Sequence, residues 1–294
     1  MGGQWEAVSL RTLAFHGPRR NGVRRSLILD PLARRIPPLD EIRAPGNSLP
    51  VNLNSGLFPV LLTAAVVVLS ADCNGRQAAP GQERAAAAAA RVRPALQADL
   101  AATGLRFGDP IFIRAFKEEM ELEVFVRDRA TRKFRLFRTY PIAKSSGNLG
   151  PKLAEGDSQV PEGFYFVPPA ALKPDSQFHL AFNVGYPNAY DRFHQRTGSS
   201  IMVHGNEVSI GCLAMTDAKI EEIYTLCAAA LSGGQPFFRV NIFPFRMTEA
   251  RLAKAAGEVW EPFWRNLKEG YDFFETKGVP PDVAVENGRY RFRE

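Results

Sequence analysis

The chain has 294 residues, of which 45% are hydrophobic and 23% charged, and its formal net charge is +6. This length supplies one good hydrophobic core plus extensions, so we expect one folded domain with flanking segments. The positive excess is too small to indicate a nucleic-acid-binding protein, and it agrees equally with simple solubility. Three cysteines, an odd number, give no disulfide framework.

Residues 1–56 form an extension rich in arginine and proline, which we predict to be poorly ordered. Residues 57–71 follow as an uncharged apolar run. This run is short for a membrane span of about 20 residues, but it suits the apolar core of a signal peptide. We therefore predict a signal peptide or membrane anchor within residues 57–73, which places the rest of the chain in the periplasm or cell envelope and limits membrane contact to this segment.

The position of this signal is unusual, because an export signal belongs near the start of a chain. No methionine lies between Met1 and Met120. Two interpretations of residues 1–56 stay open: a misassigned start and a cytoplasmic tail in front of an anchor. Cys73 follows the apolar run directly, which makes it a candidate for lipid attachment. Asp72 argues against this, because such sites have small neutral residues upstream of the cysteine.

Residues 74–105 are predicted to be a linker followed by an alanine-rich helix from Gln82 to about Ala102, interrupted near Pro94. Residues 106–294 are predicted to form one domain of the α+β class, mainly β with packed helices. Alternation and β-rich composition predict strands at 122–126, 134–140, 164–167, 179–184, 200–204 and 238–243, the first two joined as a hairpin.

Three helices are predicted in the second half of this domain. The first begins after a cap at Thr216 and ends at Gly233-Gly234. Cys227 lies on its apolar face, so we expect a buried core residue and a free thiol, as for Cys212. The other two helices are placed at 248–256 and 259–268, and the aromatic stripe of the last one is expected to pack in the core.

The segment VHGNEVSIGCLAM, residues 203–215, brings a histidine and a cysteine together between glycines. A thiol with a pKa of about 8.5 is only partly ionised at neutral pH, so a nucleophilic cysteine needs a base nearby. His204 would be the base of Cys212, and the carbonyl of Gly205 would orient the imidazole. Gly211 would let backbone N–H groups face an oxyanion. The alternative is an inert buried cysteine beside a structural histidine.

At these residues the sequence resembles the L,D-transpeptidase catalytic domain, or YkuD domain, whose signature pairs His-Gly with a downstream Ser/Thr-x-Gly-Cys. From about Pro110 to Phe292 the chain is similar to the YafK-like branch of that family. The blocks that carry the resemblance are TYPIAKSSGNLGPK, EGD, PEGFY, NVGYPNAYDR, HGN with SIGC, and FPFRMT. The resemblance implies a mixed β-sheet or sandwich with C-terminal helices, and neither a metal nor a cofactor.

Matching positions imply the roles of individual residues. Cys212 takes the place of the nucleophile, His204 that of the general base and acid, and Gly205 that of the orienting carbonyl. Ser209 matches the hydroxyl residue of the signature and is expected to form local hydrogen bonds.

Two features depart from the family pattern. The loop between His204 and Cys212 is shorter than usual, and Ala214 stands where an arginine usually engages a substrate carboxylate. Arg192, with its neighbours Tyr190 and Asp191, is a candidate for substrate binding in its place, against the alternative of a surface ion pair. Further candidates are a loop that would cover the groove, with Lys144, Ser145, Ser146 and Lys152, and Glu162 as a turn residue.

The family reaction is acyl transfer through a thioester at diaminopimelate-containing peptidoglycan stem peptides. An amine acceptor makes the enzyme a transpeptidase, and water makes it a hydrolase. The YafK-like branch is associated with hydrolytic release of a peptidoglycan-linked lipoprotein, so such a lipoprotein is a second possible partner. Two rivals are a non-catalytic peptidoglycan-binding domain and a metal hydrolase using His179, His194, His204 and Cys212, although HExxH and paired CxxC motifs are absent.

Overall fold

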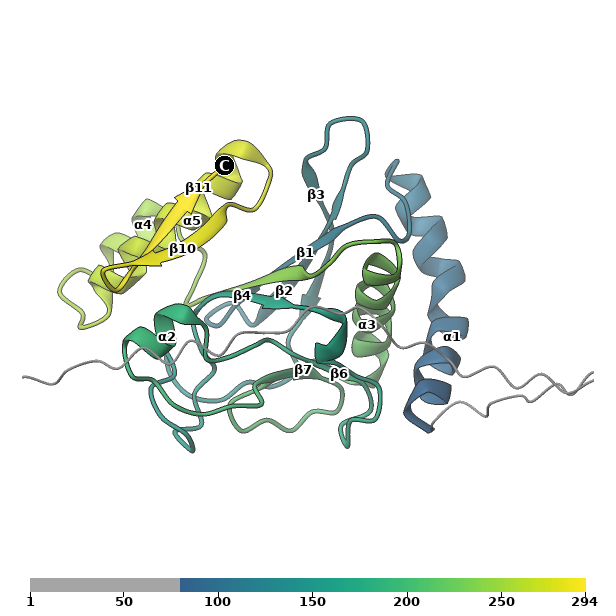
Figure 1. The fold of residues 1–294 in the computed structure, drawn as a ribbon, viewed down its shortest axis with the longest axis horizontal. Coiled ribbons are helices and arrows are strands. Elements are labelled where there is room, and N and C mark those ends of the chain that lie inside the picture. The colour runs from purple at the N-terminus through teal and green to yellow at the C-terminus, as the bar shows by residue number, and fades with distance from the viewer. Residues whose placement is uncertain (1–79) are drawn as a thin grey trace, which may run out of the picture. The chain divides into compact units, whose positions relative to one another are not determined.

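A computed structural model describes residues 80–294. The predictions for residues 1–56, for the apolar segment 57–73 and for the start of the linker lie outside this range. Within it, no helix is both long enough and apolar enough to cross a membrane. The described part combines two main sheets, a small hairpin and five α-helices (Figure 1), which confirms the predicted α+β class.

The larger sheet has five strands in the order β3-β2-β1-β9-β4. These are β1 (Ile111–Phe116), β2 (Glu121–Arg127), β3 (Phe134–Pro141), β4 (Gly163–Val167) and β9 (Phe238–Phe243). The predicted β2–β3 hairpin is confirmed, and β1 pairs in parallel with β9. β1 was not predicted: all six of its residues are buried, so it lacks the apolar–polar alternation that marks a half-exposed strand.

The smaller sheet runs β5-β6-β7-β8, and it carries the segment with His204 and Cys212. Its strands are β5 (Leu172–Lys173), β6 (Ala181–Asn183), β7 (Met202–His204) and β8 (Leu213–Ala214), with the 3-10 turn η1 (Pro169–Ala171) in front of β5. The predicted strands at 179–184 and 200–204 are present but shorter. β7 and β8 pair in parallel. The loop between His204 and Cys212 therefore runs from the end of β7 back to the start of β8.

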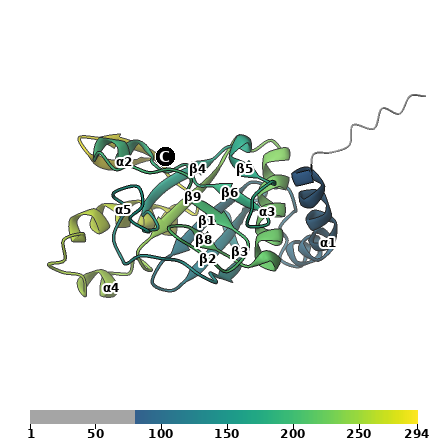
Figure 2. The same cartoon turned by 90° about the horizontal axis from the view of Figure 1, so that it is seen from below.

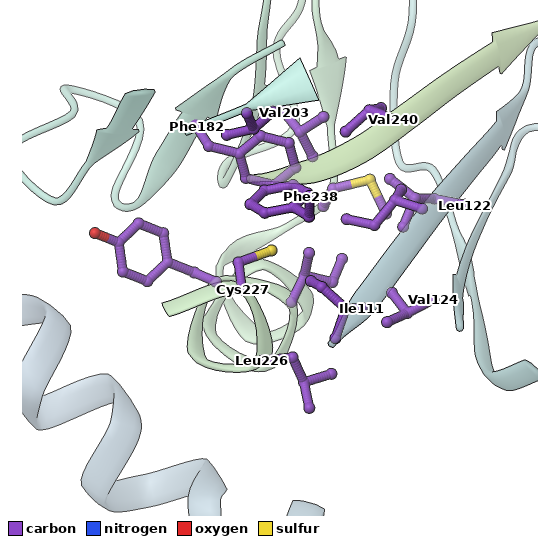
Figure 3. Close-up of a cluster of buried hydrophobic side chains, with 14 of the residues drawn as sticks. Ile111, Leu122, Val124, Phe182, Val203, Leu226, Cys227, Phe238 and Val240 are labelled. Carbon is purple, nitrogen blue, oxygen red and sulfur yellow. The ribbon is translucent and has the colours of Figure 1, made fainter. Parts of the chain in front are cut away.

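Helix α3 (Asp217–Ser232) lies where the two sheets meet. The Thr216 side chain accepts from the N–H of Lys219, and the helix ends at Gly233, so both predicted ends are confirmed. Cys227 is fully buried, and it and Cys212 are free thiols, as expected. Figure 3 shows Cys227 packed among side chains from both sheets, namely Ile111, Leu122, Val124, Phe182, Val203, Phe238 and Val240.

Helix α1 (Pro80–Ala102) lies alongside α3 in both views of the fold (Figures 1 and 2). The predicted interruption near Pro94 is wrong, because the helix continues through this residue. A proline removes one backbone donor, but alanine-rich sequence and burial of Leu96 and Leu100 on the far side of Pro94 keep the helix together.

The C-terminal part adds α4 (Glu249–Ala253), α5 (Glu261–Lys277) and the hairpin β10 (Asp282–Glu286) with β11 (Arg289–Arg293). Phe263, Trp264 and Leu267 of α5 are buried in a second apolar cluster, which confirms the expected core role of this stripe. The hairpin was not predicted. The short helix α2 (Ala189–Phe193) supplies Tyr190 to the same cluster.

Candidate active site

His204 is the last residue of β7, paired with Ala181 of β6 and Ala214 of β8, and its exposed fraction is only 2%. Its Nδ1 lies 2.5 Å from the carbonyl oxygen of Gly205. Because a carbonyl oxygen only accepts hydrogen bonds, Nδ1 carries the proton and Nε2 remains the basic nitrogen. The imidazole is thereby held in the tautomer that a general base requires.

Gly205 is fixed from both sides. Its N–H donates to the carbonyls of Phe178 (3.0 Å) and Leu180 (3.1 Å). A Cβ here would lie 2.6 Å from Oδ1 of Asp217 and 2.9 Å from the Phe178 carbonyl oxygen. Close approach of the neighbouring backbone therefore requires glycine at this position.

The Phe178 ring covers the imidazole. Its centroid lies 4.8 Å from that of His204, with 35° between the two ring planes. Burial lowers the pKa of His204 below its ordinary value, and the hydrogen bond to Gly205 opposes this shift only in part. The imidazole is therefore neutral near pH 7 and able to accept a proton.

Cys212 lies directly in front of β8. The pairing of Val203 with Leu213 sets Cys212 beside Met202, and the N–H of Met202 lies 3.4 Å from Sγ. The thiol faces the carbonyl of Ser200 at 3.8 Å. Burial raises the pKa of Cys212, against which the Met202 N–H and the charge of Lys152 act. The thiol is therefore largely protonated at neutral pH.

The thiol and the imidazole lie on neighbouring strands with an offset of two residues. From strand spacings, their Cα atoms are on the order of 8 Å apart, which two facing side chains can bridge. The hydrogen bonds within residues 80–294 include none between His204 and Sγ. Catalytic hydrogen bonds are often loose in a free enzyme and tighten only with substrate.

Two backbone N–H groups at the thiol are oriented by hydroxyls. The N–H of Gly211, a residue whose φ of +90° favours glycine, donates to Oγ of Ser146 at 2.6 Å. The N–H of Cys212 donates to Oγ of Ser209 at 3.0 Å. Ser209 thus makes the local hydrogen bonds expected of it. An oxyanion at this place would take over donors that hydroxyl groups now occupy.

Comparison with known proteins agrees with this geometry. The family profile of the L,D-transpeptidase catalytic domain, YkuD, matches residues 112–242. YafK of Escherichia coli (strain K12) is 48% identical over 183 residues, which are 62% of this chain and 74% of YafK. The chain belongs to the L,D-transpeptidase family. The resemblance read from the sequence is confirmed.

Two solved structures match part of this chain. A point mutant of Pgp2, the helical cell shape determining protein of Campylobacter jejuni, has 20% identity and a TM-score of 0.38, and the match covers 57% of this chain and 56% of that one. Bd1075 of Bdellovibrio bacteriovorus has 22% identity and a TM-score of 0.33, over 56% of this chain and 58% of the other.

The residue in place of the usual family arginine is completely enclosed. Ala214 has no exposed surface, and it pairs with β7 on one side and with Lys144 on the other. Its N–H donates to the Lys144 carbonyl at 2.9 Å.

The loop from Lys144 to Lys152 is anchored beside the thiol. Besides the pairing of Lys144 with Ala214, Ser146 reaches Gly211, and Ser145 contacts Met120 Sδ at 3.3 Å. Lys152 is 4% exposed, and its ammonium binds Asp157 at 2.6 Å. Lys152 is therefore a buried, paired cation.

Tyr190, Asp191 and Arg192 all belong to α2, whose contacts lie elsewhere. Asp191 closes a capping box with Asn188 and pairs with buried Arg196 at 2.9 Å. The Tyr190 ring stacks on Tyr290 with centroids 4.4 Å apart, and exposed Arg192 donates to a backbone carbonyl. The structure brings none of the three into hydrogen-bond contact with Cys212 or His204.

Glu162 is not a turn residue on the surface, because it is fully buried. Its carboxylate accepts from Lys117 (2.9 Å), from Trp264 Nε1 (2.8 Å) and from the N–H of Gly150 (2.7 Å). The last bond ties the loop beside the thiol to the core. Lys117 was missed in the sequence, where it is one charge in a polar run.

Two hollows are relevant to substrate access. An open one of about 400 Å³ is lined in part by Asn183, Tyr186 and Ser200, and Ser200 contacts the thiol. A larger one, about 730 Å³, lies beyond the C-terminal end of α3 among arginines such as Arg127, whereas Cys212 precedes the other end of that helix. Of these two hollows, the smaller one is therefore the one beside the thiol.

The ligands of the metal alternative do not converge. His179 Nε2 contacts Glu221 at 2.8 Å and His194 Nε2 contacts the Gly288 carbonyl at 2.9 Å. Within the described part of the chain, no group of three or more His, Cys, Asp and Glu side chains could hold a metal ion.

Proposed function

We propose that the chain is a cell-wall enzyme that transfers acyl groups at diaminopimelate-containing peptidoglycan stem peptides through a thioester on Cys212. The observation that carries the proposal is the neutral imidazole of His204, fixed by its own neighbour's carbonyl, on the strand next to the thiol. Membership of the L,D-transpeptidase family supports the same reaction.

The chemistry starts from two neutral groups. Sγ attacks the peptide carbonyl carbon, and the thiol proton passes to Nε2 of His204. The carbonyl oxygen gains the negative charge and accepts from the N–H groups of Gly211 and Cys212. The tetrahedral centre then collapses: the C–N bond breaks, the imidazolium returns its proton to the leaving amine, and a thioester remains. The Gly205 carbonyl stabilises the imidazolium throughout.

The second half of the reaction uses either an amine or water. His204 takes a proton from the acceptor, which attacks the thioester, and Cys212 leaves as the restored thiol. Hydrolysis is the second candidate outcome, and Ala214 favours it: an acceptor strand of peptidoglycan carries carboxylates, and the cation that would hold one is replaced by an enclosed methyl group. Release of a peptidoglycan-linked lipoprotein would be such a hydrolysis.

The test uses the full chain with diaminopimelate-containing sacculi, with and without a soluble amine acceptor. Mass spectrometry of released fragments separates amine-linked from hydrolysed products, and quenching with acid traps the Cys212 thioester. The matched control is Cys212→Ala, while Cys227→Ala removes the other core thiol and leaves the reaction intact. Unchanged sacculi together with no trapped thioester would refute catalysis and favour a peptidoglycan-binding domain.

A further inference from the structure

The loop of residues 175–179 touches the His204 imidazole directly. The Phe178 ring lies against the imidazole, and the Phe178 carbonyl accepts from the N–H of Gly205 at 3.0 Å. Gly205 in turn fixes Nδ1 of His204. A displacement of this loop would therefore change both the hydration of the imidazole and the position of the carbonyl that holds its proton.

Helix α1 binds the same loop through hydrogen bonds. Nη1 of Arg84 donates to the carbonyls of Ser176 and His179, each at 2.7 Å. The guanidinium therefore binds the backbone before and after Phe178. Among the ion pairs of residues 80–294, none includes Arg84, and its charge is directed at these two carbonyls. Hydrogen bonds from a charged donor are stronger than those between two neutral groups.

Two more contacts bind the loop to the helices. Gly81 of α1 approaches the loop so closely that a Cβ would lie 2.8 Å from the N atom of Asp175. His179, held at a φ of +66°, contacts Glu221 of α3, and Arg91 of α1 pairs with the same carboxylate. The loop thus contacts Gly81 at its start, Arg84 at Ser176 and His179, and Glu221 of the Arg91–Glu221 pair at its end.

We propose that α1 forms part of the catalytic apparatus, with Arg84 as a positioning residue that holds loop 175–179 so that Phe178 covers His204. This inference rests on the proposed function only in that His204 is the base. Helix α1 lies outside the residues that match the family domain, 112–242. The alanine-rich segment is accordingly more than a spacer: the catalytic geometry depends on it.

The first measurement is a substrate-free NMR titration of the His204 ring in the full chain. In Arg84→Ala the loop loosens, water reaches the imidazole, and the titration midpoint rises toward about 6.5, the value of an ordinary histidine. Arg93→Ala is the matched control, since Arg93 lies on the same helix but over the Phe107 ring, and it should titrate like the wild type. Arg84→Lys, which keeps a charged donor, should restore part of the shift.

The effect of hydration on the His204 pKa is separated from the effect of neighbouring charges by controls. The groups around the imidazole are the Cys212 thiol, Asp217 beside Gly205 and His179 on the loop. Asp217 accepts from the N–H of Asn206 (2.8 Å), and His179 is bound to Glu221. Repeating the titration in Cys212→Ala removes the thiol. Loss of the Arg84 charge by itself also raises the pKa of His204, so Phe178→Ala, which keeps Arg84, is the variant that reports hydration of the ring.

The second measurement is a double-mutant cycle of Arg84→Ala and Phe178→Ala, read as the His204 midpoint and as kcat on sacculi. If Arg84 acts through Phe178, the double variant equals Phe178→Ala alone. Misplacement of the His204 imidazole by about 1 Å lowers kcat by about 10- to 100-fold, with KM nearly unchanged. Phe178 is 40% exposed, so its truncation leaves the fold intact and keeps the test valid if Arg84→Ala is unstable.

Three outcomes would overturn the inference: an Arg84→Ala midpoint equal to that of Arg93→Ala, additive effects in the cycle, or a Phe178→Ala midpoint equal to that of the wild type. Failure of the proposed function has a different signature, namely full activity of Cys212→Ala or no product from the wild type. The titration needs no substrate, so its result stands in either case.

Discussion

The resting state of the thiol gives the sharpest prediction. A cysteine enzyme can hold its reactive pair as thiolate and imidazolium or as two neutral groups. Here burial raises the pKa of Cys212 and lowers that of His204, and both shifts favour the neutral pair. The imidazole is held by a carbonyl without a formal charge, so no carboxylate stabilises an imidazolium.

The expected alkylation rate of Cys212 follows from the fraction of the thiol that is ionised. A thiol with a pKa of about 8.5 is about 3% ionised at pH 7, and a thiolate held by an imidazolium is almost fully ionised, so the two forms differ about 30-fold in alkylation rate. Cys212 should react with iodoacetamide no faster than a free cysteine at pH 7. Its rate should rise with pH without a plateau between pH 5 and 7.

The assay quantifies the alkylated Cys212 peptide by mass spectrometry over pH 5 to 10. Cys227 is fully buried and serves as an internal reporter of unfolding, because its peptide stays unmodified in a folded chain. In His204→Ala the alkylation profile should stay close to that of the wild type, while turnover falls by about 10²- to 10⁴-fold. A pH-independent fast rate that disappears in His204→Ala would refute the neutral pair.

Three further outcomes are expected. Glu162→Gln leaves the buried Lys117 ammonium without its counter-charge and should lower the free energy of unfolding by about 3 to 5 kcal/mol, seen as a melting point roughly 6 to 20 °C lower; an unchanged melting curve would contradict it. Gly205→Ala forces its Cβ against Asp217 and the Phe178 carbonyl, so kcat on sacculi should fall about 100-fold, and Asp217→Ala in addition should recover only part of the loss because the carbonyl clash stays. The acid limb of kcat/KM reports His204 in the free enzyme, and because burial lowers its pKa, activity should persist below pH 6.5 and be lost at lower pH; a limb above 6.5 would show a hydrated imidazole.

Local signals made some elements predictable from the sequence. The Thr216 cap and Gly233 fix both ends of α3 through contacts within a few residues, and the β2–β3 hairpin follows from two β-rich runs around a charged turn. β1 was missed because burial on both faces removes alternation. Pro94 was misjudged because the packing of α1 on α3, a tertiary effect, outweighs the local cost of a proline.

The candidate site shows the same division. His204, Gly205, Ser209 and Cys212 lie within nine positions, and their contacts with one another follow from that short spacing. The contact of Ser146 with Gly211 spans 65 positions, and that of Arg84 with Ser176 spans 92. No pattern within one segment encodes such pairs, since they arise only when the two sheets and the two long helices come together.

The main chain, more than any side chain, determines how this site is arranged. A carbonyl orients the imidazole, an N–H contacts the sulfur, and two further N–H groups beside the thiol donate to serine hydroxyls. Main-chain dipoles orient without adding formal charge, so the reacting groups stay neutral until substrate arrives. In the proposed reaction, the proton transfer then occurs together with attack on the carbonyl. Under that proposal substrate alignment governs the rate, so contacts that hold the backbone around His204 matter as much as the two reactive side chains.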